Sequence, residues 1–158
     1  MAKAVRGATI GLLQSAARLS RTALAERLLA HGFYAGQDKI MLALSIENGQ
    51  APSQLAGLLG VRPPTITKTI NRLANQGFLE KRLSDEDGRR AHIFLTEQGE
   101  QAIKAIEKSV RKTEKLALKG FDKKDQKALA TLLLKIEANL NGESHDMIDE
   151  DEDAEVDA

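Results

Sequence analysis

The sequence predicts a mostly helical protein that carries one small β-hairpin near its middle. Apolar residues recur at helical spacing along most of the chain, and after Gly77 the period changes from helical to alternating. A chain of 158 residues is long enough to bury one hydrophobic core. We therefore expect a single domain over residues 1–142, followed by a separate acidic tail.

Four helices are expected before the hairpin, at about residues 6–31, 36–47, 53–59 and 63–76. Ser53 is a favourable N-cap for the short third helix. Pro63 and Pro64 can stand in the first turn of the fourth helix but not in its interior. Gly60 and Gly77 end the third and fourth helices.

Two short strands and two further helices complete the predicted order. Leu79–Arg82 and Ala91–Leu95 alternate as strands do, and residues 83–90 join them. Thr96 can cap a helix that runs from about 97 to 118. Asp122 can cap the last helix, which Asn141 and Gly142 close. A short helix, a turn, a second helix and a hairpin over about 36–96 form a winged helix-turn-helix, a DNA-binding layout.

The helix 63–76 has an apolar face of Ile66, Ile70 and Leu73, and at about 100° per residue the opposite face centres on Lys68. Short hydroxyls, one amide and two cations gather there, and such groups contact base edges and phosphates in a major groove. The candidate DNA contacts are Thr65, Thr67, Lys68, Asn71 and Arg72. Free amides at the helix start also favour a phosphate. The alternative is an ordinary solvated face.

The hairpin tip combines acids and arginines around Gly88, which permits a sharp turn. Asp87 can orient Arg89 by a charge-assisted hydrogen bond, and an arginine on a narrow tip can enter a minor groove. Arg90 follows directly and is a further candidate. The alternative is a solvated loop with incidental charges.

The net charge of zero conceals a basic body. Residues 143–158 contain nine of the 23 acids and neither Lys nor Arg, so 1–142 holds 23 basic residues against 14 acidic ones. A basic body suits a polyanionic partner, and we expect 143–158 to be a disordered tail. The tail either competes with DNA for the basic surface or only aids solubility.

Several classes of site are not supported by the residue types. The absence of cysteine excludes disulfides, thiolate metal sites and cysteine-based redox switches within this chain. The three histidines, His31, His92 and His145, lack ligand spacing, so we expect no metal site and no cofactor. No glycine loop for phosphates, paired nucleophile or apolar carboxylate pair indicates an enzyme. Without a signal peptide or membrane span, we expect a cytoplasmic location and no membrane partner.

The sequence resembles the MarR family of bacterial transcription regulators. The resemblance rests on PTITKTINRLANQGFLEKR and on a wing pattern formed by Arg82, Asp87, Arg89, Thr96 and Gly99, and it covers about residues 8–141. It implies a homodimer in which the helices at about 6–31 and 97–141 pair across a two-fold axis.

The resemblance also implies roles for individual residues. The recognition helices of the dimer would enter successive major grooves, and Thr65, Thr67, Lys68 and Asn71 of each would face the groove. Arg89 would enter the minor groove, with Asp87 orienting it and Arg82 supporting the hairpin base or touching phosphate. Such a dimer predicts a pseudo-palindromic operator with half-sites about 10 bp apart.

Control by a small phenolic or anionic effector is a further implication of the resemblance. The candidate lining residues are Leu13, Ala17, Tyr34 and Met41, where the first helix meets the second. The alternative is that all four belong to the core. We therefore expect a regulator, and a repressor rather than an activator. A protein-interaction module and a constitutive DNA-binding protein remain the alternative functions.

Overall fold

The computed structural model describes residues 7–83 and 90–142. They group into two compact units, residues 7–117 and 118–142, each of which is considered by itself. The predicted tail, 143–158, and two wing candidates, Asp87 and Arg89, lie outside the described residues.

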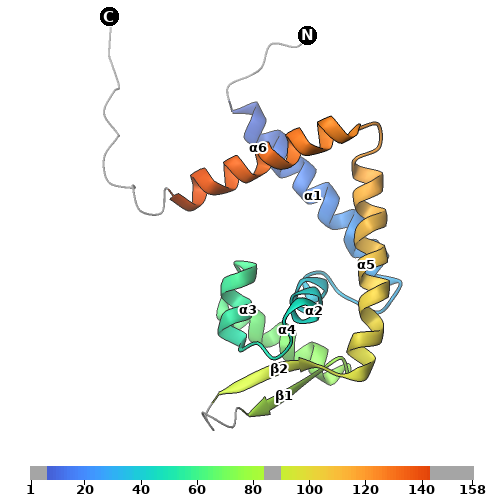
Figure 1. The fold of residues 1–158 in the computed structure, drawn as a ribbon, viewed down its shortest axis with the longest axis vertical. Coiled ribbons are helices and arrows are strands. Elements are labelled where there is room, and N and C mark those ends of the chain that lie inside the picture. Colours follow the sequence, from blue (N-terminus) through green and yellow to red (C-terminus); the bar gives the residue numbers. More distant parts are fainter. Residues whose placement is uncertain (1–6, 84–89, 143–158) are drawn as a thin grey trace, which may run out of the picture. The chain divides into compact units, whose positions relative to one another are not determined.

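The described residues form helices and one two-stranded antiparallel hairpin, which confirms the predicted fold class (Figure 1). The elements are α1 (Ala8–Leu29), α2 (Gln37–Ile46), α3 (Pro52–Leu59), α4 (Pro63–Asn75), β1 (Leu79–Leu83), β2 (Ala91–Leu95), α5 (Glu97–Ala117) and α6 (Lys123–Gly142). Their order and approximate bounds agree with the pattern in the sequence. No helix among the described residues is long and apolar enough to cross a membrane.

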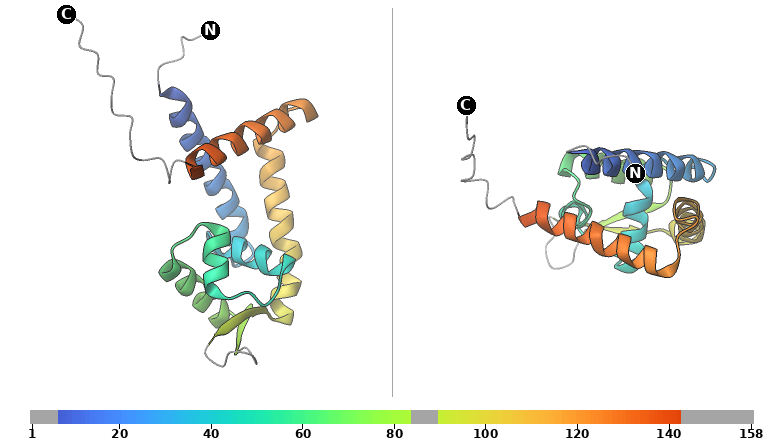
Figure 2. Two further views of the ribbon diagram at one scale, coloured as in Figure 1. Left: turned by 60° about the vertical axis from the view of Figure 1, so that its left-hand side comes forward. Right: turned by 90° about the horizontal axis from the view of Figure 1, so that it is seen from above.

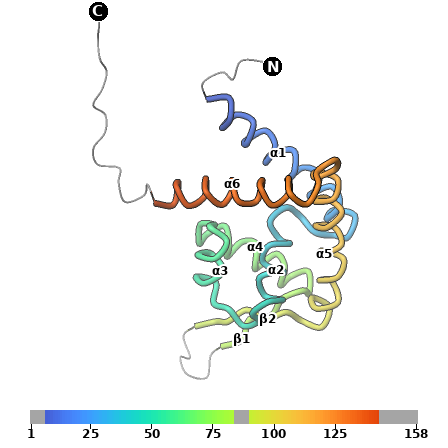
Figure 3. The backbone as a smooth tube through the Cα atoms, turned by 45° about the horizontal axis from the view of Figure 1, so that its top comes forward, coloured from blue at the N-terminus to red at the C-terminus, as the bar shows by residue number. Residues whose placement is uncertain are grey.

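The core of the first unit lies where α2, α3, α4 and the hairpin meet, and Figure 3 shows α3 and α4 joined by their short turn above the strands. Helix α2 is its centre, because Met41 and Leu44 are fully buried. From α4, Ile66, Ile70 and Leu73 enter this core, as their spacing predicts. Helix α1 contacts α5, and Figure 2 shows these two helices from two directions.

The register of the hairpin is fixed by the residue pairs between its two strands and by a bridge to the segment before α3. Leu79 pairs with Leu95, and Leu83 pairs with Ala91. Residue Gln50 forms an isolated bridge with Ile93, whose amide donates to the Gln50 carbonyl at 2.8 Å. The segment before α3 thereby pairs with β2 at one residue, as a short third strand would, and connects the hairpin to the core.

The junction between α4, the hairpin and α5 is built on the backbone carbonyls of two residues, Gly77 and Phe78. The Thr96 hydroxyl donates to the Gly77 carbonyl at 2.6 Å and accepts from the Gly99 amide at 3.0 Å. The Thr96 amide donates to the Phe78 carbonyl at 3.0 Å. Thr96 is therefore the N-cap that its sequence position predicts.

The other two caps had different outcomes. The carboxylate of Asp122 accepts from the Asp125 amide at 2.7 Å, which confirms the predicted cap of α6. Ser53 is not the cap of α3, because that helix begins at Pro52. Proline favours the first helical position, where its missing N–H costs nothing, and the Gln54 side chain accepts from the Ala51 amide at 2.8 Å instead.

Helix α6 forms the described part of the second unit and buries none of its side chains within it. Its exposed apolar residues are Leu132, Leu133, Leu134 and Leu140. An amphipathic helix that leaves such side chains in water needs a partner surface to be stable.

We expect Gly99→Ala to lower the free energy of unfolding by roughly 1–3 kcal/mol, because the junction has no room for a methyl group. A Cβ atom at Gly99 would lie 2.2 Å from the Phe78 carbonyl oxygen and 3.3 Å from Leu95 Cδ2. Urea denaturation followed by circular dichroism measures the loss.

Gly57→Ala is the matched control, since Gly57 also lies in a helix and a Cβ atom there would meet nothing within 4 Å. Helix propensity predicts a gain of about 0.5–1 kcal/mol for this control. Equal stability of the two variants would contradict the crowded junction.

Candidate nucleic-acid interface

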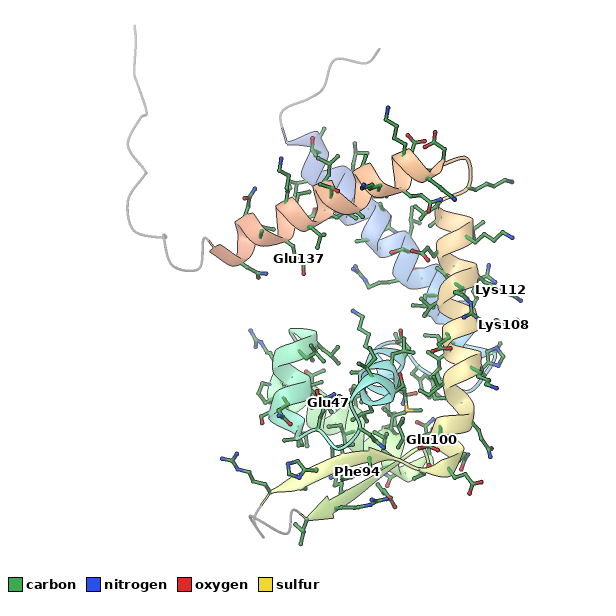
Figure 4. All side chains as sticks on the ribbon, in the orientation of Figure 1. Glu47, Phe94, Glu100, Lys108, Lys112 and Glu137 are labelled. Carbon is green, nitrogen blue, oxygen red and sulfur yellow. The ribbon has the colours of Figure 1, made fainter. Side chains whose placement is uncertain are left out.

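The solvent-facing side of α4 carries all five residues that the sequence predicts as major-groove contacts. Each of them is exposed, whereas the three apolar residues on the opposite side are buried. The five are Thr65, Thr67, Lys68, Asn71 and Arg72. Figure 4 shows α4 with its side chains beside the hairpin and the other helices of the first unit.

The first turn of α4 does not offer the free amides that we expected for a phosphate. Pro63 and Pro64 have no N–H, and the amides of Thr65 and Ile66 both donate to the Arg62 carbonyl, at 3.0 and 3.1 Å. An anion at this end must therefore be held mainly by side chains. Arg62 and Lys68 are the exposed cations near it.

Two cations beside the candidate DNA surface are held by aromatic rings. The guanidinium carbon of Arg72 lies 5.6 Å from the centroid of the Tyr34 ring. That of Arg82 lies 4.4 Å from the Phe94 centroid, and its Nε donates to Glu80 Oε1 at 2.9 Å. Contact with an aromatic face restrains a long side chain at little desolvation cost. Arg82 thus contacts both strands of the hairpin, one residue pair away from the end of the ladder that leads to the tip.

The wing itself is only partly described. Arg90 is exposed just before β2 begins, and the described residues end at Leu83 on the other strand. The orienting role of Asp87 and the minor-groove role of Arg89 stay predictions.

An open hollow of about 440 Å³ lies between the start of α2 and the exposed side of α4, and we call it the α2–α4 hollow. Its lining residues are Tyr34, Ala35, Gln37, Pro64, Thr65, Lys68, Thr69 and Arg72. It combines one aromatic ring with two cations and two hydroxyls. That set matches a small aromatic anion, because the ring can stack while the cations meet the charge.

Of the four predicted effector residues, only Tyr34 lines this hollow. Met41 is fully buried in the core, and Leu13 and Ala17 are half-buried on α1. The other three are not among the residues that line this hollow, and the predicted effector pocket stays a prediction.

Two glutamines that sequence reasoning missed join the hollow to the end of α4. Gln37 is 1% exposed, and its Oε1 accepts from the Tyr34 amide at 2.9 Å. Its Nε2 donates to Gln76 Oε1 at 2.9 Å, and Gln76 Nε2 donates to the Gly32 carbonyl at 3.3 Å. No clear signal in the sequence pointed to Gln37, which is the first of three polar residues at the start of α2.

A third missed residue is Lys81, whose Nζ donates to Asn71 Oδ1 at 2.5 Å. Alternation along β1 places Lys81 on the same face as Leu79, which is buried against the core next to α4. This alternation was the signal in the sequence that could have identified it.

Burial affects one carboxyl in α2. Asp38 is 4% exposed, and desolvation raises its pKa above the ordinary value of 3.8. Backbone hydrogen bonds and the charge of Lys39 oppose this shift without cancelling it. Within residues 7–83 and 90–142, no group of three His, Asp or Glu side chains is placed to hold a metal ion.

Known proteins are similar to this chain both in sequence and in fold. Residues 34–91 match the model of the MarR family. An uncharacterised HTH-type transcriptional regulator of Bacillus subtilis (strain 168), YwoH, is 28% identical over 120 residues, which cover 76% of this chain and 87% of that protein.

Solved structures agree with this match. A crystal structure of MarR is 27% identical, with a TM-score of 0.72, over 84% of this chain and 92% of that one. A mutant MarR from E. coli complexed with operator DNA is 21% identical, with a TM-score of 0.74, over 79% of this chain and 90% of that one. Because the E. coli mutant is only 21% identical to this chain, its similarity shows a shared fold and nothing more.

The shifted pKa of Asp38 predicts a pH dependence of stability. Because the folded protein holds this proton more tightly than the unfolded chain does, ionisation of Asp38 costs stability as pH rises from 3.8 through the raised folded pKa. Asp38→Asn removes that titration. We therefore expect the stability of the variant relative to the parent to be greatest near neutral pH and to decline as pH falls towards 3.8.

Urea unfolding of both proteins at several pH values measures the difference. Asp125→Asn provides the comparison at an exposed carboxyl. A difference between parent and Asp38→Asn that is constant with pH would show that burial does not shift this group.

Proposed function

The chain belongs to the MarR family of transcriptional regulators, and we propose that it represses transcription as a homodimer bound to a pseudo-palindromic operator, from which a small-molecule effector releases it. The observation that carries the proposal is the exposed face of α4, with Lys68 at its centre and the hairpin wing beside it. Such a regulator works in the cytoplasm, where bacterial DNA lies.

Specific contacts come from the recognition helix α4. Lys68 and Arg72 can donate to guanine, while Thr65 and Thr67 suit a phosphate or a thymine methyl group. Arg82, Arg90 and, at the tip, Arg89 oriented by Asp87 provide the wing contacts. A relative supports this arrangement, since a mutant MarR from E. coli has been crystallised with operator DNA.

Dimerisation is supported by apolar side chains that the described residues leave exposed. Besides the leucines of α6, Leu12 and Leu19 of α1 are 71% and 58% exposed. Pairing two copies through these helices removes both surfaces from water. A two-fold dimer places its recognition helices one turn of DNA apart, so the half-sites lie about 10 bp apart.

Electrostatics supports the affinity of this interface. The body, 1–142, holds 23 basic residues against 14 acidic ones, and phosphate contacts of such a surface release counterions. Binding should therefore weaken steeply with salt. The acidic residues of 143–158 would either compete with DNA or act only as a solubilising segment, and deleting them at low salt separates these roles.

Release by an effector is supported by the α2–α4 hollow. Thr65, Lys68 and Arg72 line it and also belong to the proposed DNA contacts. A phenolic or anionic molecule in the hollow would draw Arg72 and Lys68 away from DNA. A constitutive DNA-binding protein would lack this response, and a protein-interaction module would not select DNA at all.

Lys68→Ala should weaken operator binding by about 1–3 kcal/mol and relax base preference at one position of each half-site, because its ammonium donates to a base edge. If Lys68 contacts phosphate only, the loss will be uniform across sequences. Selection of bound fragments from a random DNA pool gives the operator, and fluorescence anisotropy gives the affinities.

Lys108→Ala is the matched control, since Lys108 is an equally exposed lysine on α5 (Figure 4). It should reduce affinity much less than Lys68→Ala. If the folded dimeric protein selects no motif, the operator-binding proposal is wrong and the interaction module takes its place. If Lys68→Ala binds the operator as the parent does, Lys68 is not a DNA contact.

The effector hypothesis predicts that 4-hydroxybenzoate, a phenolic anion, shifts the ring NMR signals of Tyr34 and weakens operator binding. Tyr34 is the sole tyrosine of the chain, which has no tryptophan, so the assignment is unambiguous. Ala35→Phe fills the hollow from outside the proposed DNA contacts and should abolish both effects. Unchanged Tyr34 signals at a saturating concentration would refute this site for phenolic anions.

A further inference from the structure

The hydrogen bond between Lys81 and Asn71 joins the middle of β1 to the exposed face of the recognition helix, α4. Lys81 Nζ donates to Asn71 Oδ1 at 2.5 Å, from β1 to α4. Both side chains are exposed to solvent. The two residues therefore form one polar unit on the surface that we assign to DNA.

The ammonium group fixes which way the amide of Asn71 is turned. An asparagine amide has one acceptor oxygen and one donor nitrogen, whereas an ammonium group only donates. Turning the amide over would place its N–H₂ group against the ammonium, so that two donors faced each other. Asn71 therefore keeps its oxygen on Lys81 and turns its N–H₂ group away from the lysine.

The charge of Lys81 is kept available by its surroundings. The neighbouring carboxylate, Glu80, accepts from Arg82 and forms an ion pair with it. The Lys81 ammonium also has two further N–H groups after its bond to Asn71. The Asn71–Lys81 unit thus presents donors to an approaching base.

The edges of the bases differ in what they require from such a unit. In the major groove, adenine offers one acceptor and one donor, so an asparagine that pairs with it uses both its oxygen and its nitrogen. Guanine offers two acceptors, N7 and O6. A unit made of donors matches guanine and not adenine.

We propose that Asn71 and Lys81 together select guanine at one position of each half-site, and that Lys81 is the specificity-determining residue. This inference rests on the proposed function, since it concerns the DNA contacts of α4. It also reverses the usual expectation for an isolated asparagine, which favours adenine.

The test compares the operator motifs selected by the parent, Asn71→Ala, Lys81→Met and Lys81→Arg. The parent should prefer guanine over adenine at the position that loses its preference in Asn71→Ala, by roughly 5- to 150-fold in affinity. Lys81→Met frees the Asn71 oxygen at similar side-chain length, so the preference should move to adenine. Lys81→Arg retains a donor-only partner and should retain guanine.

Lys108→Met controls for the loss of one positive charge away from this face and should leave the guanine preference intact. Thermal melting of each variant checks that the fold survives. If Lys81→Met weakens binding equally on all sequences and keeps the base preference, Lys81 contacts phosphate and the inference is overturned. An adenine preference in the parent also overturns it, whereas absence of any selected motif rejects the proposed function itself.

Discussion

The carbonyl groups of Gly77 and Phe78 are the point on which the arrangement of the first unit depends. Thr96 binds both of them, through its hydroxyl and its amide, and caps α5 with the same hydroxyl. Gly99 lets the first turn of α5 approach the Phe78 carbonyl. The end of α4, the base of the hairpin and the start of α5 therefore share one small set of backbone contacts, which couples the orientation of the hairpin to that of α4.

Local patterns in the sequence predicted the elements, because helix period, strand alternation and capping depend on neighbours only a few residues away. Thr96 and Asp122 were predicted as caps for this reason, whereas Ser53 was not a cap because Pro52 takes the first helical position. The candidate interface was less predictable. The bond from Lys81 to Asn71 and the path from Gln37 to Gln76 join different elements, and a single sequence does not specify such contacts.

The exposed side of α4 contributes side chains both to the α2–α4 hollow and to the proposed DNA-binding surface. Thr65, Lys68 and Arg72 line the α2–α4 hollow and also stand among the proposed DNA contacts. The ring of Tyr34 holds Arg72 at the edge of the hollow. A ligand and a phosphate would therefore draw on the same cations, and competition between them needs no large movement of the protein.

The hydrogen-bonded path from Gly32 through Gln76 and the buried Gln37 to the Tyr34 amide contains amides and no ionisable group. Its hydrogen bonds therefore do not respond to protonation, and ions in solution screen them far less than they screen contacts between charges. Interactions of the exposed α4 cations with other charges weaken strongly as ionic strength rises. The amide hydrogen bonds that hold the end of this helix do not. The position of the helix is thus independent of the ionic strength that would modulate its proposed contacts with DNA.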